Sequence, residues 1–171
     1  GALPMLFRRG WRGPVFATPA TVDLCRAMLE DSAAIQAQDA RYVNRRVRRD
    51  HPEVEPIEPL YDHGDVATCL AHLRPLPYHR RARVAAGTTL TFHDAGHVLG
   101  SAVVALDVDD VGAAKRLCFT GDLGRHDVPI LRDPEPVDGV EVLVTESTYG
   151  DRTHEPRDRL DAHLGEVVRA T

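Results

Sequence analysis

The spacing of apolar residues divides the chain into an early helical part and a later part rich in strands. Thr18 followed by Pro19 predicts a helix start, because a hydroxyl can cap the first turn and a proline there loses no hydrogen bond. After this start, apolar residues recur at helical spacing. We expect a long helix whose apolar stripe packs on a sheet, the stripe being Val22, Cys25, Met28, Leu29 and Ala33.

Two further helices follow from the same reasoning. A proline-rich connector over 51–59 precedes a short helix over 65–73, whose shared face is formed by Val66, Leu70 and Leu73. Pro75 and Pro77 are expected to end it. At the other end, residues 160–171 again show a helical pattern, with no glycine or proline to stop it.

From residue 83 onward the apolar period changes from helical spacing to two. Gly87, Gly112 and the segment 133–136 separate the successive apolar runs. This pattern predicts four or five consecutive strands and therefore an α/β fold. The alternating positions are Val84; Leu90 and Phe92; Val104, Leu106 and Val108; Leu117 and Phe119; and Val140, Val142 and Val144.

Composition narrows the class of protein. The chain has 171 residues, 43% of them apolar, and a formal net charge of −5, which is typical of one soluble globular domain. No apolar stretch approaches the roughly 18 residues of a membrane span. Cys25, Cys69 and Cys118 are far apart in sequence, so reduced thiols in a cytoplasmic protein are the simpler interpretation than a disulfide framework or a zinc knuckle.

Positive charge is concentrated early in the chain. Residues 1–50 hold nine arginines against five acidic residues. Arg45, Arg46, Arg48 and Arg49 form a cluster that could pair with an RNA backbone, because guanidinium groups bind phosphate in a bidentate manner. A solvated helix face is the favoured interpretation of such a run.

Three polar motifs stand at the ends of successive predicted strands. They are Asp94–Ser101 with His97, Phe119–Arg125 with Asp122, and Thr145–Arg152 with Glu146. Neighbouring strands deliver their ends to the same edge of a sheet. An imidazole and two carboxylates gathered there suit a pair of metal ions that keep room for water, so the motifs predict a hydrolytic metal site.

These motifs resemble the metallo-β-lactamase fold, and more narrowly its β-CASP branch of RNA-processing nucleases, which includes ribonuclease J and the endonuclease subunit of the cleavage and polyadenylation specificity factor. The resemblance rests on Ala-Gly-His-x-x-Gly-Ser, Gly-Asp-Leu-Gly and Glu-Ser-Thr-Tyr-Gly-Asp-Arg in this order. It implies an αβ/βα sandwich and two zinc ions in the full-length protein. It also implies that residues 1–146 belong to the metallo-β-lactamase domain and that residues 147–171 begin the β-CASP domain.

The resemblance also assigns roles to the three residues. His97 is expected to be a terminal zinc ligand, and Asp122 the carboxylate that bridges both ions and takes part in catalysis. Glu146 corresponds to the first acidic motif of the β-CASP branch, where it would orient a histidine or a proton beside the phosphate. A helix-capping or salt-bridging glutamate is the alternative for this position.

One expected motif does not occur in the chain. The family's His-x-His-x-Asp-His, which supplies most metal ligands, normally stands just before a turn like Gly1–Pro4. We therefore expect an internal segment of a longer protein, with a partial sandwich that lacks its first strands. By itself this segment is expected to be inactive, and a missing strand would leave an unpaired edge and low stability.

The other histidines are weaker candidates. His93 is expected to point to the sheet face opposite Phe92, and His126 to make a loop hydrogen bond rather than a metal contact. His154 could meet a phosphate, although an exposed polar residue is the simpler interpretation. The remaining histidines lie on expected connectors or helix surfaces without partners close in sequence: His51, His63, His72, His79 and His163.

Three functions fit these observations. The favoured one is zinc-dependent cleavage of phosphodiester bonds in single-stranded RNA, with self-assembly left open. The second is a non-catalytic relative that binds RNA or a partner subunit, against which the retention of His97, Asp122 and Glu146 argues. The third is a small-molecule metallo-hydrolase such as a thioesterase or lactamase, which the motif starting at Glu146 disfavours.

Overall fold

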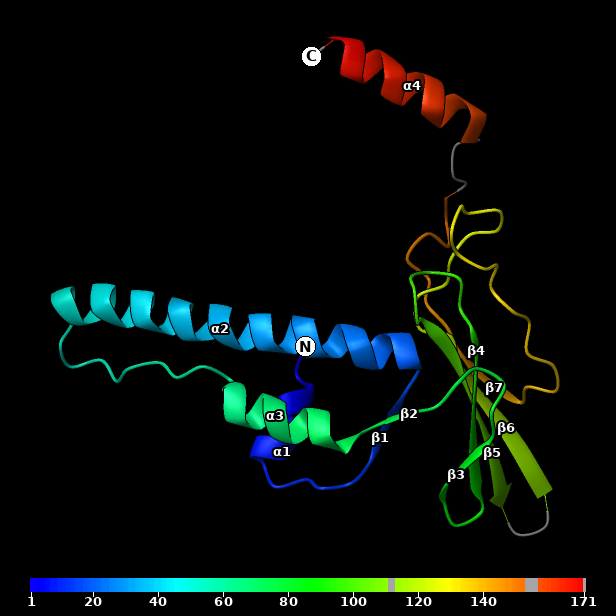
Figure 1. The fold of residues 1–171 in the computed structure, drawn as a ribbon, viewed down its shortest axis with the longest axis horizontal. Helices are drawn as coiled ribbons and strands as arrows, with labels where there is room; N and C mark the ends of the chain where they lie inside the picture. The colour runs from blue at the N-terminus through cyan, green and yellow to red at the C-terminus, as the bar shows by residue number, and fades with distance from the viewer. Residues whose placement is uncertain (111–112, 153–156, 171) are drawn as a thin grey trace.

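The computed structural model describes residues 1–110, 113–152 and 157–170, which form a mixed α/β arrangement (Figure 1). The long helix α2 lies beside α1 and α3, and the strands β3 to β7 form a separate sheet next to them. The elements are α1 (Leu3–Arg8), β1 (Val15–Ala17), α2 (Pro19–Asp50), α3 (His63–His72), β2 (Leu73–Pro75), β3 (Ala82–Ala85), β4 (Thr88–Asp94), β5 (Ala102–Asp110), β6 (Ala113–Phe119), β7 (Val142–Val144) and α4 (Arg157–Ala170).

Helix α2 begins where the sequence predicts, but its apolar face has a different partner. The Thr18 hydroxyl accepts a hydrogen bond from the Thr21 amide, and Pro19 occupies the first turn. The buried stripe packs mainly on α1, α3 and the segment before α3, with Val15 of β1 at the margin of this core, and not on the five-stranded sheet as expected. Met28 is 58% exposed, so its place in the stripe was wrong. The core residues are Phe7, Leu29, Ala33, Tyr61, Val66 and Cys69.

Helix α3 confirms the second predicted helix and corrects its end. Asp62 and Asp65 form a capping box that fixes its start. The helix ends at His72, and Leu73 is instead the first residue of β2. Pro75 therefore does not stop the helix directly. It lies in β2, which pairs only with β1 in a two-stranded parallel sheet, where a proline is tolerated.

The sequence predicts four or five strands, and five form, in the order β3-β4-β5-β6-β7. The last of them is shorter than the expected 140–145 and spans Val142–Val144. Neighbours are antiparallel except for the parallel pair β6 and β7. Leu90 and Phe92 are buried on one face together with Leu76. The opposite face buries Val103 and Cys118, against the segment that connects β6 to β7. The sheet is therefore covered on both faces near the end of β4.

The ends of the chain show two further features. Strand β7 lies at the edge of the sheet, and its three apolar side chains are all exposed. The low stability expected for an unpaired edge stays a prediction. Helix α4 confirms the third predicted helix, although Thr171 lies outside the described residues. It stands apart from the sheet in Figure 1, and none of the described helices is long and apolar enough to span a membrane.

Candidate metal centre

The structure brings His97, Asp122 and Glu146 to the same end of the sheet. The Nε2 atom of His97 lies 3.8 Å from Oδ2 of Asp122. The pKa of the Glu146 carboxyl group is lowered by the hydrogen bond from the Leu123 amide, then by one from Thr148, and to a smaller extent by the His97 imidazole. His97 follows β4, Asp122 follows β6 and Glu146 follows β7. The proximity expected from the strand ends is thus present, while metal binding by these residues stays a prediction.

The loop that carries His97 is held by its own side chains. The Asp94 carboxylate accepts a hydrogen bond from the Gly96 amide at 2.9 Å, the pattern of an Asx turn. The Ser101 hydroxyl accepts bonds from the amides of His97 and Val98 at 3.1 and 3.2 Å. Ser101 is the last residue of the first motif, so its role is to fix the backbone that presents the imidazole.

A second anchor of this loop comes from the start of α2. The hydroxyls of Thr18 and Thr21 donate to the Gly100 carbonyl at 2.7 and 2.9 Å. Gly100 has φ +90, and a Cβ there would lie 2.8 Å from the Thr21 amide nitrogen. Only glycine fits this approach without strain. The helix start therefore also positions the His97 loop, a role that the sequence pattern did not reveal.

We expect Thr18→Ala to destabilise the fold by about 1–2 kcal/mol, since it removes a helix cap and a buried hydrogen bond. Thr18 is only 2% exposed. Thr18→Ser is the matched control, because it retains the hydroxyl, and it should lose much less. Urea unfolding of both variants measures the difference. Equal losses would show that the methyl group, not the hydroxyl, stabilises this site.

The loops that carry Asp122 and Glu146 are joined to each other. The Thr120 amide donates to the Val144 carbonyl at 3.0 Å, and the two hydroxyls of Thr120 and Thr145 lie 3.1 Å apart. Beyond them, the Leu123 amide donates to Oε1 of Glu146 at 2.6 Å. This bond and one from Thr148 hold the pKa of Glu146 below its usual value, so the carboxylate stays ionised at neutral pH.

The donor atoms present fit part of a metal site. Zinc ligands at about 2.0–2.2 Å in tetrahedral geometry lie about 3.4 Å apart, close to the separation of the His97 and Asp122 atoms. Their side chains are 45% and 73% exposed, so solvent and ions reach them. Glu146 already accepts an amide bond at Oε1, which suits an orienting role better than a ligand role.

Some of the other histidines lie where the sequence predicts, and one makes contacts that the sequence did not indicate. His126 lies 3.4 Å from Asp133, in agreement with the predicted loop contact. His93 lies on the face opposite Phe92, as expected, and shares a cleft with Thr91. His79 has no partner close in sequence, but the fold brings it into contact with Glu135 and His93. His154 lies outside the described residues.

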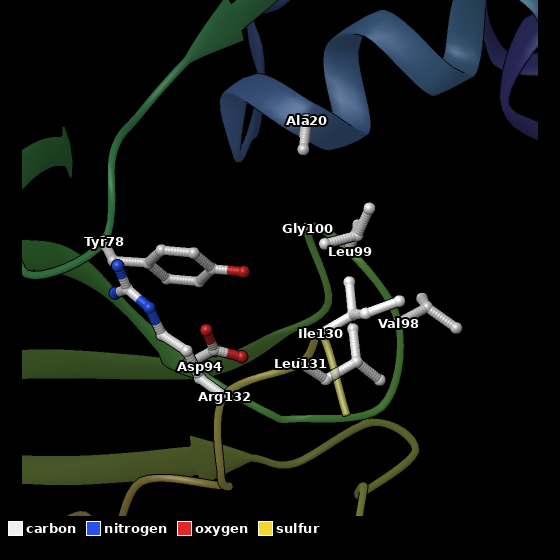
Figure 2. Close-up of a pocket in the computed structure, with 9 residues that line it drawn as sticks. All are labelled: Ala20, Tyr78, Asp94, Val98, Leu99, Gly100, Ile130, Leu131 and Arg132. Atoms are coloured by element: carbon white, nitrogen blue, oxygen red, sulfur yellow. The ribbon is translucent and has the colours of Figure 1, made fainter. Parts of the chain in front are cut away.

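A small cleft adjoins the His97 loop without including the three candidate residues. Its volume is about 260 Å³. Figure 2 shows Tyr78, Asp94 and Arg132 on one side of it and the apolar side chains of the His97 loop and of Ile130 and Leu131 on the other. The Tyr78 hydroxyl donates to the Ser101 carbonyl at 2.8 Å, and burial raises the pKa of this phenol. This hydrogen bond from Tyr78 therefore also helps to fix the His97 loop.

Comparisons with known proteins agree with the motifs. Ribonuclease TTHA0252 of Thermus thermophilus is 39% identical over 171 residues, covering all of this chain and 34% of the relative. Transcription termination factor FttA of Methanosarcina mazei is 33% identical, covering all of this chain and 24% of that protein. Endoribonuclease ysh1 of Schizosaccharomyces pombe is 29% identical over 99% of this chain and 20% of its own length. No family model matches the chain.

The strand ends of the sheet gather an imidazole and two carboxylates, side chains of the class that hydrolytic enzymes use. The relatives narrow this class, because the chain is homologous to RNA-processing nucleases, and its resemblance to the β-CASP metallo-β-lactamase nucleases is confirmed. The chain spans about a third or less of the length of these relatives.

Proposed function

We propose that the protein containing this chain is a zinc-dependent ribonuclease of the β-CASP type that cleaves single-stranded RNA. The observation that carries the proposal is the 3.8 Å approach of His97 Nε2 to Asp122 Oδ2, beside an ionised Glu146. Three strand ends far apart in sequence meet there, in a chain that is 39% identical to a named ribonuclease and 29% identical to a named endoribonuclease. Loops with a purely structural role would not need an imidazole and two carboxylates to lie close together.

The proposal extends to the architecture. Residues 1–146 would be part of a metallo-β-lactamase αβ/βα sandwich, and residues 147–171 would begin the β-CASP domain. The exposed edge strand β7 would pair with strands supplied elsewhere in the protein. We also propose a cytoplasmic location, on the basis of three cysteines that remain free thiols and whose pKa values are raised by burial.

In this proposal the chain's residues have distinct tasks. His97 and Asp122 would hold zinc, whose Lewis acidity makes hydroxide accessible near neutral pH and neutralises phosphate charge. Asp122 adds a negative charge that favours cations at this edge. Glu146, held by the Leu123 amide, would orient a neighbouring group or accept a hydrogen bond beside the phosphate. Two ligands cannot enclose two ions, so the chain alone should not cleave RNA.

The test uses the full-length protein and end-labelled single-stranded RNA. We expect cleavage that stops on chelation and returns with zinc, while single-stranded DNA and small thioesters or lactams are not hydrolysed. RNA binding without cleavage by the zinc-loaded protein would favour the non-catalytic alternative. Hydrolysis of a small ester with intact RNA would favour the small-molecule hydrolase. Either result would overturn the ribonuclease assignment.

A further inference from the structure

A second group of metal-ligating side chains lies outside the candidate centre. His79, His93 and Glu135 each offer one ligand atom, and these atoms all lie within 4.8 Å of one another. The Nε2 atom of His79 is 3.3 Å from Oε1 of Glu135, and Nδ1 of His93 is 3.8 Å from Oε2. Two imidazoles and one carboxylate are a known ligand set for zinc, with a fourth position left for water.

The backbone around this group is fixed independently of any metal. The Glu135 amide donates to the Asp94 carbonyl at 2.9 Å, and the Asp94 amide donates to Oε2 of Glu135 at 3.0 Å. The His79 amide donates to the Phe92 carbonyl at 2.9 Å. A hydrogen bond from a backbone amide to one carboxylate oxygen fixes the direction of the other oxygen. Side chains that bind metals are commonly oriented by such hydrogen bonds.

The two imidazoles lie next to each other in an arrangement that leaves room for a cation. Their rings lie edge to face with centroids 5.5 Å apart. Burial, and then the neighbouring His79, lowers the pKa of His93, so its nitrogen lone pair is free at neutral pH. The His79 side chain is 56% exposed and can rotate to close the spacing to the about 3.4 Å of zinc ligands.

Two arginines in the same cleft would repel a cation, but both already form ion pairs with Asp107. The cleft has a volume of about 210 Å³ and includes Arg81 and Arg116. Arg81 lies 3.0 Å and Arg116 2.7 Å from the carboxylate oxygens of Asp107. The hydrogen bond from Arg116 holds the pKa of Asp107 below its usual value, so this carboxylate stays charged and offsets part of the positive charge of the two arginines. Glu135 thereby remains available to a metal.

We infer that His79, His93 and Glu135 form a second site, with one open coordination position, for zinc or a similar divalent transition metal, separate from the His97–Asp122 pair. The metal would join the segment containing Glu135 to strand β4. That segment also contacts the start of the His97 loop, because a Cβ on Gly96 would lie 2.7 Å from Pro134. Metal binding at the second site would therefore restrain the loop that carries His97.

The test removes the first site to expose the second. In the full-length protein carrying His97→Ala and Asp122→Asn, we expect at least one equivalent of zinc or cobalt(II) in a calorimetric or optical titration. Metal should also raise the unfolding midpoint, since a ligand that binds only the folded state stabilises it. His79→Ala and Glu135→Gln should each weaken metal binding by at least about tenfold. Removing only a hydrogen-bond partner of a ligand already costs about that much affinity, and removing the ligand itself should cost more.

The matched control is His126→Ala, which removes an exposed histidine that pairs with Asp133 near Glu135. It should bind metal as tightly as the parent. Absence of any bound equivalent, unchanged affinity in His79→Ala and Glu135→Gln, or an equal loss in His126→Ala would each overturn the inference. Because the parent lacks His97 and Asp122, failure of the ribonuclease proposal leaves this result unaffected.

Discussion

Asp122→Asn in the full-length protein is expected to reduce RNA cleavage by at least about 10³-fold. Metal-assisted stabilisation of the transition state contributes several kcal/mol, and each 1.4 kcal/mol is a factor of ten in rate. The substitution keeps the shape of the side chain but removes the charge that lies 3.8 Å from His97. Single-turnover cleavage of labelled RNA measures the loss, and metal analysis after dialysis should show less zinc.

The control for this experiment is Asp138→Asn, the same chemical change on an exposed residue away from the centre. It should cleave RNA at the parental rate. Turnover by Asp122→Asn within a few-fold of the parent would end the assignment of Asp122 as a ligand. Loss of cleavage in both variants would indicate a general sensitivity to charge rather than a metal site.

Gly96→Ala is expected to destabilise the fold about 1–3 kcal/mol more than Gly121→Ala. Both glycines have positive φ, +65 and +57, so each alanine pays about 1–2 kcal/mol for the left-handed backbone. A Cβ at Gly96 would also meet Pro134 at 2.7 Å and the Arg132 carbonyl at 2.8 Å, whereas at Gly121 it meets open space. The additional cost is that of overpacking.

Urea unfolding of the two variants at equal m-values gives this difference directly. The crowded position also lies next to His97, so Gly96→Ala should displace the imidazole and lower RNA cleavage in the full-length protein. Equal midpoints for the two variants would show that the segment around Pro134 yields to the new methyl group. The predicted restraint on the His97 loop would then be absent.

The candidate centre could be predicted because its residues stand at the ends of regular strands. His97, Asp122 and Glu146 each follow an apolar run with a period of two. The strands β4, β6 and β7 run in the same direction, with β5 between β4 and β6, so their ends lie at the same edge of the sheet. The distance between the side chains could not be predicted. It depends on three loops whose paths are set by contacts such as the bond from Leu123 to Glu146.

Other features needed the tertiary structure because their parts are distant in sequence. The stripe of α2 was located from its spacing, but spacing shows which side of a helix is buried, not what covers it. Met28 was misplaced for a different reason: it points about 100° around the helix from the buried Leu29, which places it beyond the edge of the stripe. His79 and Glu135 carry no sequence pattern that links them, and they meet only because the segment after β6 returns to β4.

The sequence by itself determined the strands, the start and apolar side of α2, and the polar residues at the strand ends. These are local properties, encoded in period, capping residues and glycines with required backbone angles. Only the tertiary structure decided that α2 packs on helices, that Thr18 holds the His97 loop, and that His79, His93 and Glu135 converge. Such contacts depend on the paths of loops between elements, which nearest-neighbour patterns do not specify.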